Sequence, residues 1–479
     1  MNYKVYVDGK EIVTNPARVS KMPFNMVWSG YQRDKAQTEI AWFVTFDMAK
    51  PVEIKIDVLD ASVEEVKIRP LEFGIDYTVS GNTITAKLES PKKFTVEVNG
   101  THETLHVFAN EPDNFVADEN TIYYGPGEHE AGLICPESGQ TIYLAEGAVV
   151  YGGIFAYKVD NVTVRGRGIL DSSKMKRGAE LTPEDEVYKK LKSIDFDNTD
   201  IGDFSSFVAY GCNNFKVEGI VLRDAPFWSV IVRNGCTNVD IRNIKVIGQW
   251  RYNSDGVDLC ASQNAVLADS FIRSFDDGIV VRAVCLQKET YGCENMLIEN
   301  NIVWCDWGKN LEIWNGNKNS IIKDIVFKNN YLIHSVDKCI SIDTWYGAPS
   351  IVVENVTYEN IYIDTDTDYP VPYIQQSKDH EYPCFGQKSQ NVKSILVCVS
   401  RVGKNTGNQG IDTNVETDGF HMAYRNIAFK NVVCNNPDKL LPAVIDTGSV
   451  DDMSNITFED CRLGKINFLC TKEIKTPRW

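Results

Sequence analysis

Apolar and polar residues alternate with a period of two in several short runs along the first part of the chain. Runs of this kind cover residues 3–7, 52–58 and 94–98. Turn-forming pairs such as Asp8-Gly9 separate them. Because side chains of a strand point alternately to opposite faces, such runs at short spacing predict an antiparallel β-sandwich. The polar, proline-containing segment 109–114 marks a boundary, so we expect a sandwich domain over residues 1–112.

From Ile122 onward a different phrase recurs, in which an asparagine opens a short run of alternating apolar residues. The opening asparagines include Asn161, Asn214, Asn238, Asn264 and Asn295. The last four are separated by 24, 26 and 31 residues, and periods of this length indicate a solenoid with one rung per repeat. An asparagine at a fixed place in each rung suits either a left-handed turn or a ladder of side chains. We therefore predict an all-β chain with a parallel β-helix over residues 113–479.

Three segments interrupt the repeat. Residues 172–206 contain one predicted helix, with Thr182 as N-cap and Pro183 at the first helical position. Residues 364–392 and 401–425 have no strand pattern, and loops of this length are usually functional. We expect them to form walls of a groove.

Composition removes several classes of function. The net charge of −17 argues against a nucleic-acid partner, and mildly against polyanionic substrates. No apolar run reaches the roughly 20 residues that span a bilayer, so no membrane partner is expected. Six dispersed histidines and the lack of a C-x-x-C pair predict no metal site and no cofactor. The odd number of cysteines, 13, and the absence of a secretory pattern at the N-terminus favour a cytoplasmic protein.

Three aspartates lie about one repeat apart. Asp255 occurs in Asn-Ser-Asp-Gly, and Asp276 and Asp277 follow it by 21 and 22 residues in Phe-Asp-Asp-Gly. One repeat of separation would place Asp255 beside the other two on the next rung. Carboxylates held that close do not all ionise easily, and a protonated acid beside ionised ones is what glycosidic hydrolysis needs. The alternative is that both motifs are only turn formers.

These motifs, with Arg223-Asp224-Ala225-Pro226-Phe227-Trp228 ahead of them, resemble the core of glycoside hydrolase family 28, the polygalacturonase-like enzymes. The chain is also similar to the dextranase-type family 49, which has a β-sandwich ahead of its β-helix. The resemblance implies a right-handed parallel β-helix of the pectin-lyase-like kind. It also implies an open groove for an oligosaccharide or polysaccharide, and hydrolysis with inversion.

The family's catalytic roles carry over to the aspartates. By resemblance Asp276 is the general acid, and Asp255 and Asp277 hold and activate the water. Asn253 orients Asp255 or a sugar hydroxyl, or is simply a turn residue.

Two family motifs are altered. Where polygalacturonases have Gly-His-Gly, this chain has Gly308-Lys309, with Glu312 close behind. Lys309 and Glu312 are expected to bind substrate hydroxyls or to tune Asp276, the alternative being a solvated ion pair. Arg282 stands where the family usually has lysine, and it is expected to meet a substrate hydroxyl or to pair with Asp343.

The second altered motif is the cationic clamp for substrate carboxylates. The family's Arg-Ile-Lys corresponds to Ser341-Ile342-Asp343 here. Serine and aspartate cannot make a bidentate grip on a carboxylate, so a substrate other than simple polygalacturonate is expected. Trp345 follows as a face on which a sugar ring can stack.

Two rival functions remain open. A polysaccharide lyase or epimerase on the same fold would need a uronate substrate, against which the altered clamp argues. A non-catalytic glycan-binding β-helix would leave the three aspartates without a role.

Overall fold

The computed structural model describes most of the chain. The described residues are 1–21, 35–194, 204–283, 292–315, 320–335, 338–344, 350–364, 375–377, 380–381, 395–401, 421–439, 443–446, 452–464 and 466–469. The two loops predicted at 364–392 and 401–425 fall largely outside these ranges, as does Trp345.

The N-terminal part is a β-sandwich of two five-stranded sheets, ordered β2-β1-β5-β8-β7 and β3-β4-β10-β9-β6. Its strands are β1 Tyr3–Val7, β2 Lys10–Ile12, β3 Asn15–Ser20, β4 Thr38–Asp47, β5 Val52–Val58, β6 Val66–Arg69, β7 Tyr77–Ser80, β8 Thr83–Leu88, β9 Lys93–Val98 and β10 Leu105–Asn110. Two 3-10 helices, η1 (Lys35–Gln37) and η2 (Leu71–Phe73), connect them. Among the described strands the pairings are antiparallel except that of β4 with β10, which is parallel.

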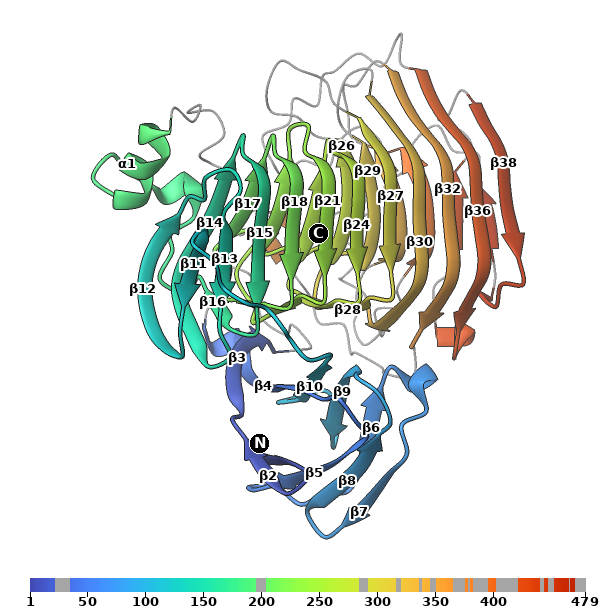
Figure 1. The fold of residues 1–479 in the computed structure, drawn as a ribbon. Helices are drawn as coiled ribbons and strands as arrows, with labels where there is room; N and C mark the ends of the chain where they lie inside the picture. The colour runs from blue at the N-terminus through green and yellow to red at the C-terminus, as the bar shows by residue number, and fades with distance from the viewer. Residues whose placement is uncertain are drawn as a thin grey trace.

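The rest of the chain is a right-handed parallel β-helix, as predicted (Figure 1). Its front face in Figure 1 consists of β11 Thr121–Tyr124, β13 Thr141–Leu144, β15 Asp160–Gly166, β18 Asn213–Glu218, β21 Thr237–Arg242, β24 Gln263–Ala268, β27 Cys293–Glu299, β30 Ser320–His334, β32 Ser350–Ile363, β36 His421–Cys434 and β38 Asp452–Glu459. The sandwich face, toward the N-terminal domain, consists of β16 Ile169–Asp171, β19 Val221–Arg223, β22 Lys245–Ile247, β25 Phe271–Ser274 and β28 Ile302–Cys305, and it continues in the C-terminal part of β30, which pairs with β28.

The third face, called the site face below, carries the aspartate motifs at the start of its strands. It consists of β17 Phe207–Tyr210, β20 Val230–Arg233, β23 Val257–Cys260, β26 Ile279–Ala283, β29 Leu311–Asn315, β31 Lys338–Thr344, β35 Ile395–Arg401, β37 Ala443–Asp446 and β39 Ile466–Leu469. Strands β12 (Gly127–Ile134) and β14 (Ala148–Tyr157) run from the sandwich face into the site face. The remaining short elements are the hairpin β33 (Gln375–Ser377) and β34 (His380–Glu381), and the 3-10 helices η3 (Gly178–Glu180) and η5 (Pro437–Lys439).

The recurrent asparagines both adopt left-handed turns and form a side-chain ladder, the two alternatives that the sequence left open. Asn161, Asn214, Asn264 and Asn295 adopt left-handed backbone conformations, with φ between 52° and 58°. Their side chains also form a ladder, in which Asn214 Nδ2 donates to Asn161 Oδ1 at 2.6 Å and Asn295 Nδ2 to Asn264 Oδ1 at 2.8 Å. A second ladder, not predicted, follows the opposite end of the front face through Asp269, Asn300, Asn329, Asn360 and Asn431.

The insertion after β16 contains the helix α1 (Glu186–Ser193), but the predicted cap is wrong. The N-cap is Asp185, not Thr182. The Asp185 carboxylate accepts bonds from the Thr182 backbone N–H at 2.8 Å and from its hydroxyl at 3.0 Å. This turn keeps residues 182–185 out of the helix. Leu191 anchors α1 in a small core with Phe155 and Phe204.

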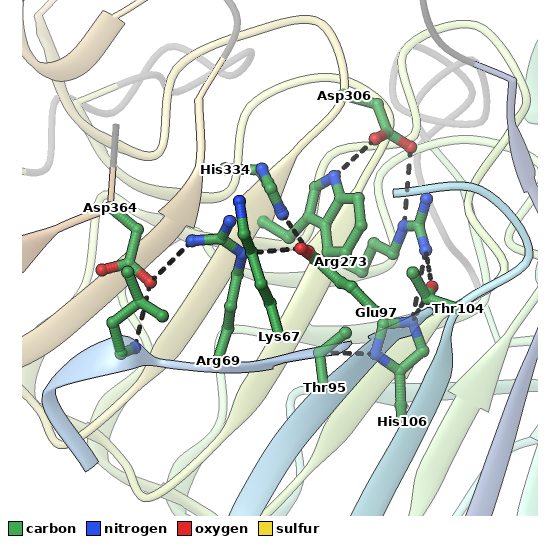
Figure 2. A network of polar contacts seen from close by, with 12 residues as sticks. Lys67, Arg69, Thr95, Glu97, Thr104, His106, Arg273, Asp306, His334 and Asp364 are labelled. Carbon is green, nitrogen blue, oxygen red and sulfur yellow. Dashed lines mark hydrogen bonds and ion pairs between the residues drawn. The ribbon is translucent and has the colours of Figure 1, made fainter. Parts of the chain in front are cut away.

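The sandwich packs on the β-helix through an apolar cluster and a buried polar network. Phe108 of the sandwich packs on Phe271 of the sandwich face, with Phe43 and Trp304 in the same apolar cluster. Figure 2 shows the polar network around this contact. Within it, Arg69 Nε donates to Glu97 Oε2 at 2.8 Å and Arg69 Nη1 donates to Asp364 Oδ2 at 3.2 Å.

The other half of the network reaches the rungs that carry the aspartates. Arg273 Nη1 donates to Thr104 Oγ1 at 3.1 Å and to His106 Nε2 at 3.2 Å, and Arg273 Nε lies 3.8 Å from Asp306 Oδ2 (Figure 2). Burial, followed by the charge of Arg273, holds the pKa of His106 well below its usual value. His106 is therefore neutral, and its Nε2 atom accepts a hydrogen bond from Arg273.

Arg69→Met removes the cation that two buried carboxylates face. Glu97 is 2% exposed, and the carboxylate of Asp364 is 7% exposed. Because breaking a buried pair leaves an uncompensated charge, we expect the free energy of unfolding to fall by roughly 3–5 kcal/mol. Chemical denaturation followed by circular dichroism measures this.

The control is Lys87→Met, which removes a cation from an exposed pair with Glu89. That change should cost less than about 1 kcal/mol. Equal effects of the two substitutions would contradict the assigned role of Arg69.

Candidate active site

The aspartate motifs lie just ahead of three stacked strands of the site face. The register pairs Val257 of β23 with Ile279 of β26, and Ile279 with Leu311 of β29. The stacking continues into the preceding turns, where Gly256 N donates to Asp277 O at 2.8 Å and Gly278 N donates to Lys309 O at 2.7 Å. A separation of 22 residues is therefore one rung. The structure brings Asp255, Asp277 and Lys309 into one column, with Asp276 at its edge.

Glycine at 308 makes room for these carboxylates. A Cβ on Gly308 would lie 2.4 Å from Asp277 Oδ1 and 2.7 Å from Asp276 Oδ1. Real Cβ atoms do not approach so closely. Glycine is therefore required at position 308 for steric reasons, although lysine occupies the histidine position of the Gly-His-Gly motif.

Arg282 is the centre of the charge cluster. Its Nη2 atom lies 3.5 Å from Asp255 Oδ2, 3.5 Å from Asp258 Oδ1, 3.4 Å from Asp277 Oδ2 and 3.5 Å from Glu312 Oε2. The guanidinium carbon also lies 4.4 Å from the ring centroid of Trp228 and 5.1 Å from that of Trp314. Arg282 is thus committed to protein groups.

The expected alternative partner of Arg282, Asp343, lies on β31. In the sheet register, Arg282 of β26 pairs with Trp314 of β29, and Trp314 pairs with Asp343 of β31. Asp343 therefore lies two strands from Arg282. The side chain of Asp343 lies outside the described residues.

Lys309 and Glu312 form a buried pair in the same cluster. Lys309 Nζ lies 2.9 Å from Glu312 Oε1 and 3.3 Å from Asp277 Oδ1, and the Lys309 backbone N–H donates to Asp277 Oδ1 at 2.9 Å. Glu312 is only 1% exposed. The alternative of a solvated ion pair is therefore wrong, because the sheet places Glu312 against Arg282 rather than in water.

The environment separates the pKa values of the two adjacent aspartates. Burial, reinforced by the charge of Asp277, raises the pKa of Asp276 to about 7. Burial also acts to raise the pKa of Asp277, but Lys309 and Arg282 outweigh it and bring that pKa to about 2. At neutral pH Asp277 is ionised while Asp276 retains a substantial share of its proton.

Two further carboxyl groups share the cluster with raised pKa values. Burial, with the charge of Asp258, raises the pKa of Asp255 well above its usual value. Burial and the charge of Asp277 raise the pKa of Glu312 to about 7.

Asp258 is a member of the cluster that sequence reasoning missed. It lies on β23, is 0% exposed, and burial raises the pKa of its carboxyl group to about 8. Neither carboxylate oxygen has a hydrogen-bond partner among the described residues. The available signal was its position three residues after Asp255, in a strand whose neighbouring residues are apolar.

The remaining predicted site residues are less informative. Asn253 adopts a left-handed conformation with φ 54°, which supports the turn interpretation. Trp345 lies outside the described residues.

Within the described part of the chain, no cluster of three or more His, Cys, Asp or Glu side chains is arranged to hold a metal ion. None of the described helices is long and apolar enough to cross a membrane.

Comparison with known proteins identifies the fold family. The model of glycosyl hydrolases family 28 matches residues 148–440, more than half of the chain. The chain belongs to glycosyl hydrolase family 28. The same residues contain the aspartate column and the cluster around Arg282.

The relatives found are distant. The chain is 27% identical over 215 residues to polygalacturonase QRT2 of Arabidopsis thaliana, covering 38% of this chain and 48% of the relative. It is 24% identical over 363 residues to exopolygalacturonase clone GBGE184 of the same plant, covering 66% of this chain and 79% of the relative. The chain spans about half or less of the length of most of these curated relatives.

A solved structure shares both domains. Dex49A from Penicillium minioluteum aligns over 97% of this chain and 89% of its own, with a TM-score of 0.56 and 14% identity. This likeness shows the fold, with a sandwich ahead of the β-helix, and nothing about the substrate.

Gly308→Ala tests the steric role of the glycine. We expect a fall of about 10²-fold in kcat/KM for glycan hydrolysis, since displacing reacting groups by about 1 Å has that order of effect. Gly125→Ala, where the nearest atom to a new Cβ is 3.5 Å away, should leave activity unchanged. Normal activity in Gly308→Ala, with an unchanged melting temperature, would show that Asp276 and Asp277 do not need their present positions.

The pH dependence of stability tests the protonation of Asp258. A carboxyl group whose pKa rises from 3.8 to about 8 on folding contributes stability that is present below about pH 4 and is lost as the pH rises through about 8. Asp258→Asn removes this pH-dependent contribution. As the pH rises, the free energy of unfolding should therefore fall less steeply in the variant than in the wild type, by up to roughly 1.4 kcal/mol per pH unit. Urea denaturation at pH 5, 6, 7 and 8 measures the slope.

Asp240→Asn is the control for this experiment. Asp240 lies on the front face and its side chain is 38% exposed beside Arg242. This substitution should leave the slope as in the wild type. A wild-type slope in Asp258→Asn would mean that Asp258 is ionised in the folded protein.

Proposed function

We propose that this protein is a glycoside hydrolase that cleaves O-glycosidic bonds of an oligosaccharide or polysaccharide with inversion. Asp276 is the general acid that protonates the leaving oxygen. Asp277 and Asp255 hold and activate the attacking water. The observation that carries the proposal is the stacking of Asp255 and Asp277 on adjacent rungs, with Asp276 beside them and with Lys309 and Arg282 in contact with Asp277. This arrangement separates the pKa values of Asp276 and Asp277, to about 7 and about 2.

The two values suit the two tasks. A general acid works best when its pKa lies near the operating pH, because it then holds its proton and can still release it. A water-activating carboxylate must be ionised while its neighbour is not. Lys309 keeps Asp277 ionised through its Nζ and its backbone N–H. The activity should therefore decline as the pH rises above about 7, when Asp276 loses its proton.

The protonation of Asp255 is coupled to that of Asp258. Its carboxylate contacts Arg282 Nη2 at 3.5 Å, yet burial and Asp258 raise its pKa. The two carboxyl groups Asp255 and Asp258 titrate as a pair around one cation. Proton placement within this pair sets whether Asp255 accepts the proton of water alone or shares that task with Asp277.

The substrate is proposed to be other than simple polygalacturonate. Several relatives are named polygalacturonases. Their family's cationic clamp corresponds here to Ser341 and Asp343 on β31, next to β29 in the sheet. Serine and aspartate cannot supply a cationic clamp, so a glycan that does not need that clamp is favoured.

Asp276→Asn tests the acid. The fold should be retained, while kcat on a natural oligosaccharide falls by at least about 10²–10⁴-fold, the usual contribution of general acid catalysis. Aryl glycosides with activated leaving groups need little protonation and should recover part of the rate. Proton NMR of the first product from the wild type should show the anomer opposite to that of the substrate.

Two results would contradict the proposal. Near wild-type turnover of an oligosaccharide by Asp276→Asn would remove Asp276 as the acid. An unsaturated product absorbing in the ultraviolet would indicate a lyase instead of a hydrolase.

A further inference from the structure

The backbone carbonyl of Asp276 is held by two buried side chains outside the groups proposed to act on the substrate. Ser274 Oγ donates to Asp276 O at 2.6 Å, and Cys305 Sγ donates to the same oxygen at 3.0 Å. Both side chains belong to residues that are 0% exposed. The carbonyl is part of the peptide group between Asp276 and Asp277, so its orientation affects the backbone that carries both catalytic carboxyl groups.

The two donors come from neighbouring strands of the sandwich face. Ser274 is the last residue of β25 and Cys305 the last of β28, and the register pairs them with each other. The residues before them, Arg273 and Trp304, are also register partners, and the Arg273 guanidinium lies 3.7 Å from the ring centroid of Trp304. Both belong to the buried contact with the sandwich domain. The donors are therefore placed by a face of the β-helix other than the site face.

The amide side of Asp276 is held as well. Its N–H donates to Ser254 O at 3.3 Å, and the N–H of Phe275 donates to the same oxygen at 3.2 Å. Ser254 directly precedes Asp255, and its hydroxyl donates to Arg251 O at 2.6 Å. The peptide groups on both sides of Asp276 therefore have hydrogen-bond partners, and the backbone of the acid is tied to the turn that carries Asp255.

The Cys305 thiol can donate because it keeps its proton. Burial, followed by the charge of Asp277, raises the pKa of Cys305 well above its usual value. A thiol is a weaker hydrogen-bond donor than a hydroxyl group. The Ser274 hydroxyl should therefore hold the Asp276 carbonyl more strongly than the thiol does.

Loss of these donors would allow the peptide group to turn. A buried carbonyl that loses its partners bears the full desolvation penalty, and rotation of the peptide toward another donor would relieve it. Such a rotation would displace the carboxyl group of Asp276 from its position beside Gly308. Displacing a reacting group by about 1 Å lowers a rate by about 10²-fold.

We propose that Ser274 and Cys305 are positioning residues for the general acid, which act by fixing the peptide group between Asp276 and Asp277. They contact the backbone and not the reacting atoms. The inference rests on the proposed function, because a positioned acid matters only for a reaction that uses its proton. Loss of the donors should therefore slow protonation of the leaving oxygen more than it changes substrate binding.

The leaving group of the substrate separates positioning of the acid from a general loss of structure. The probes are phenyl and dinitrophenyl glycosides of the same sugar, compared as matched pairs across a panel of hexoses. A phenyl group needs the proton of Asp276 to leave, whereas a dinitrophenyl group leaves without it. In Ser274→Ala we expect kcat for the phenyl glycoside to fall by at least about tenfold, with KM nearly unchanged and the dinitrophenyl rate lowered less than about twofold.

Cys305 allows a substitution that keeps a donor. Cys305→Ala should show the same selective loss as Ser274→Ala to a smaller extent, and Cys305→Ser, which retains a hydroxyl donor, should recover the phenyl rate. Ser262→Ala is the matched control, because Ser262 is also 0% exposed and its hydroxyl donates to Cys260 O at 2.7 Å. It should leave the ratio of the phenyl and dinitrophenyl rates as in the wild type.

Three results would overturn the inference. These are equal losses on both leaving groups in Ser274→Ala, wild-type rates on both in Ser274→Ala, and no recovery in Cys305→Ser relative to Cys305→Ala. If Ser274→Ala does not fold, the comparison of the two Cys305 variants decides.

A wild type that hydrolyses no glycoside of the panel would contradict the proposed function instead. NMR titration of isotope-labelled aspartate carboxyl groups then tests the positioning without turnover. The Asp276 signal, assigned by its loss in Asp276→Asn, should titrate at a different pH in Ser274→Ala, because the carboxyl group has moved relative to Asp277. An unchanged titration would show that Ser274 does not position Asp276.

Discussion

One guanidinium nitrogen organises the candidate active site. Arg282 Nη2 lies within 3.5 Å of carboxylate oxygens from Asp255, Asp258, Asp277 and Glu312. With Asp276 the cluster has five carboxyl groups, and Lys309 is the second cation in contact with them. Two cations cannot neutralise five buried carboxylates, so protons must remain on some of them. The excess of acid over base in this buried cluster is thus the physical origin of a protonated acid at neutral pH.

That excess is tolerable only because the surrounding backbone is rigid. The in-register stacking of β23, β26 and β29 fixes the spacing of the carboxylates, and glycine at 308 admits them at short range. The sandwich domain adds a second restraint. Arg273 lies three residues ahead of Asp276 and Asp306 three ahead of Lys309, and both belong to the buried network at the domain interface (Figure 2). The rungs that carry Asp276 and Lys309 are therefore held from outside the β-helix as well as from within.

The sequence predicted those parts of the structure that repeat. The asparagine phrase and the spacing of Asp255 from Asp277 follow from a regular rung, and each rung constrains the next. Parts that depend on one long-range contact were not predicted. Glu97 and His334 are 237 residues apart, and no periodic pattern links them. The N-cap of α1 was misplaced because Asp185 adopts an extended conformation, with φ −70° and ψ 134°, which separates the turn at 182–185 from the helix.

The same distinction holds for the candidate site, where residues in a repeated motif were predicted and residues that matter through a single contact were not. The aspartate pair could be found from motif and spacing, but Asp258 resembled an ordinary polar residue of a strand. Its importance depends on Arg282, which lies one rung away and 24 residues later in the sequence. Likewise, Lys309 and Glu312 were expected in the site but with a solvated ion pair left as the alternative, and only the sheet register shows that Glu312 faces Arg282. The sequence alone does not show which side chains face one another on neighbouring rungs.

The positions of the cations bear on substrate choice. Arg282 is occupied by carboxylates of the protein, and Lys309 by Asp277 and Glu312. Neither can therefore replace the family's clamp without giving up the contacts that set the protonation of the acid.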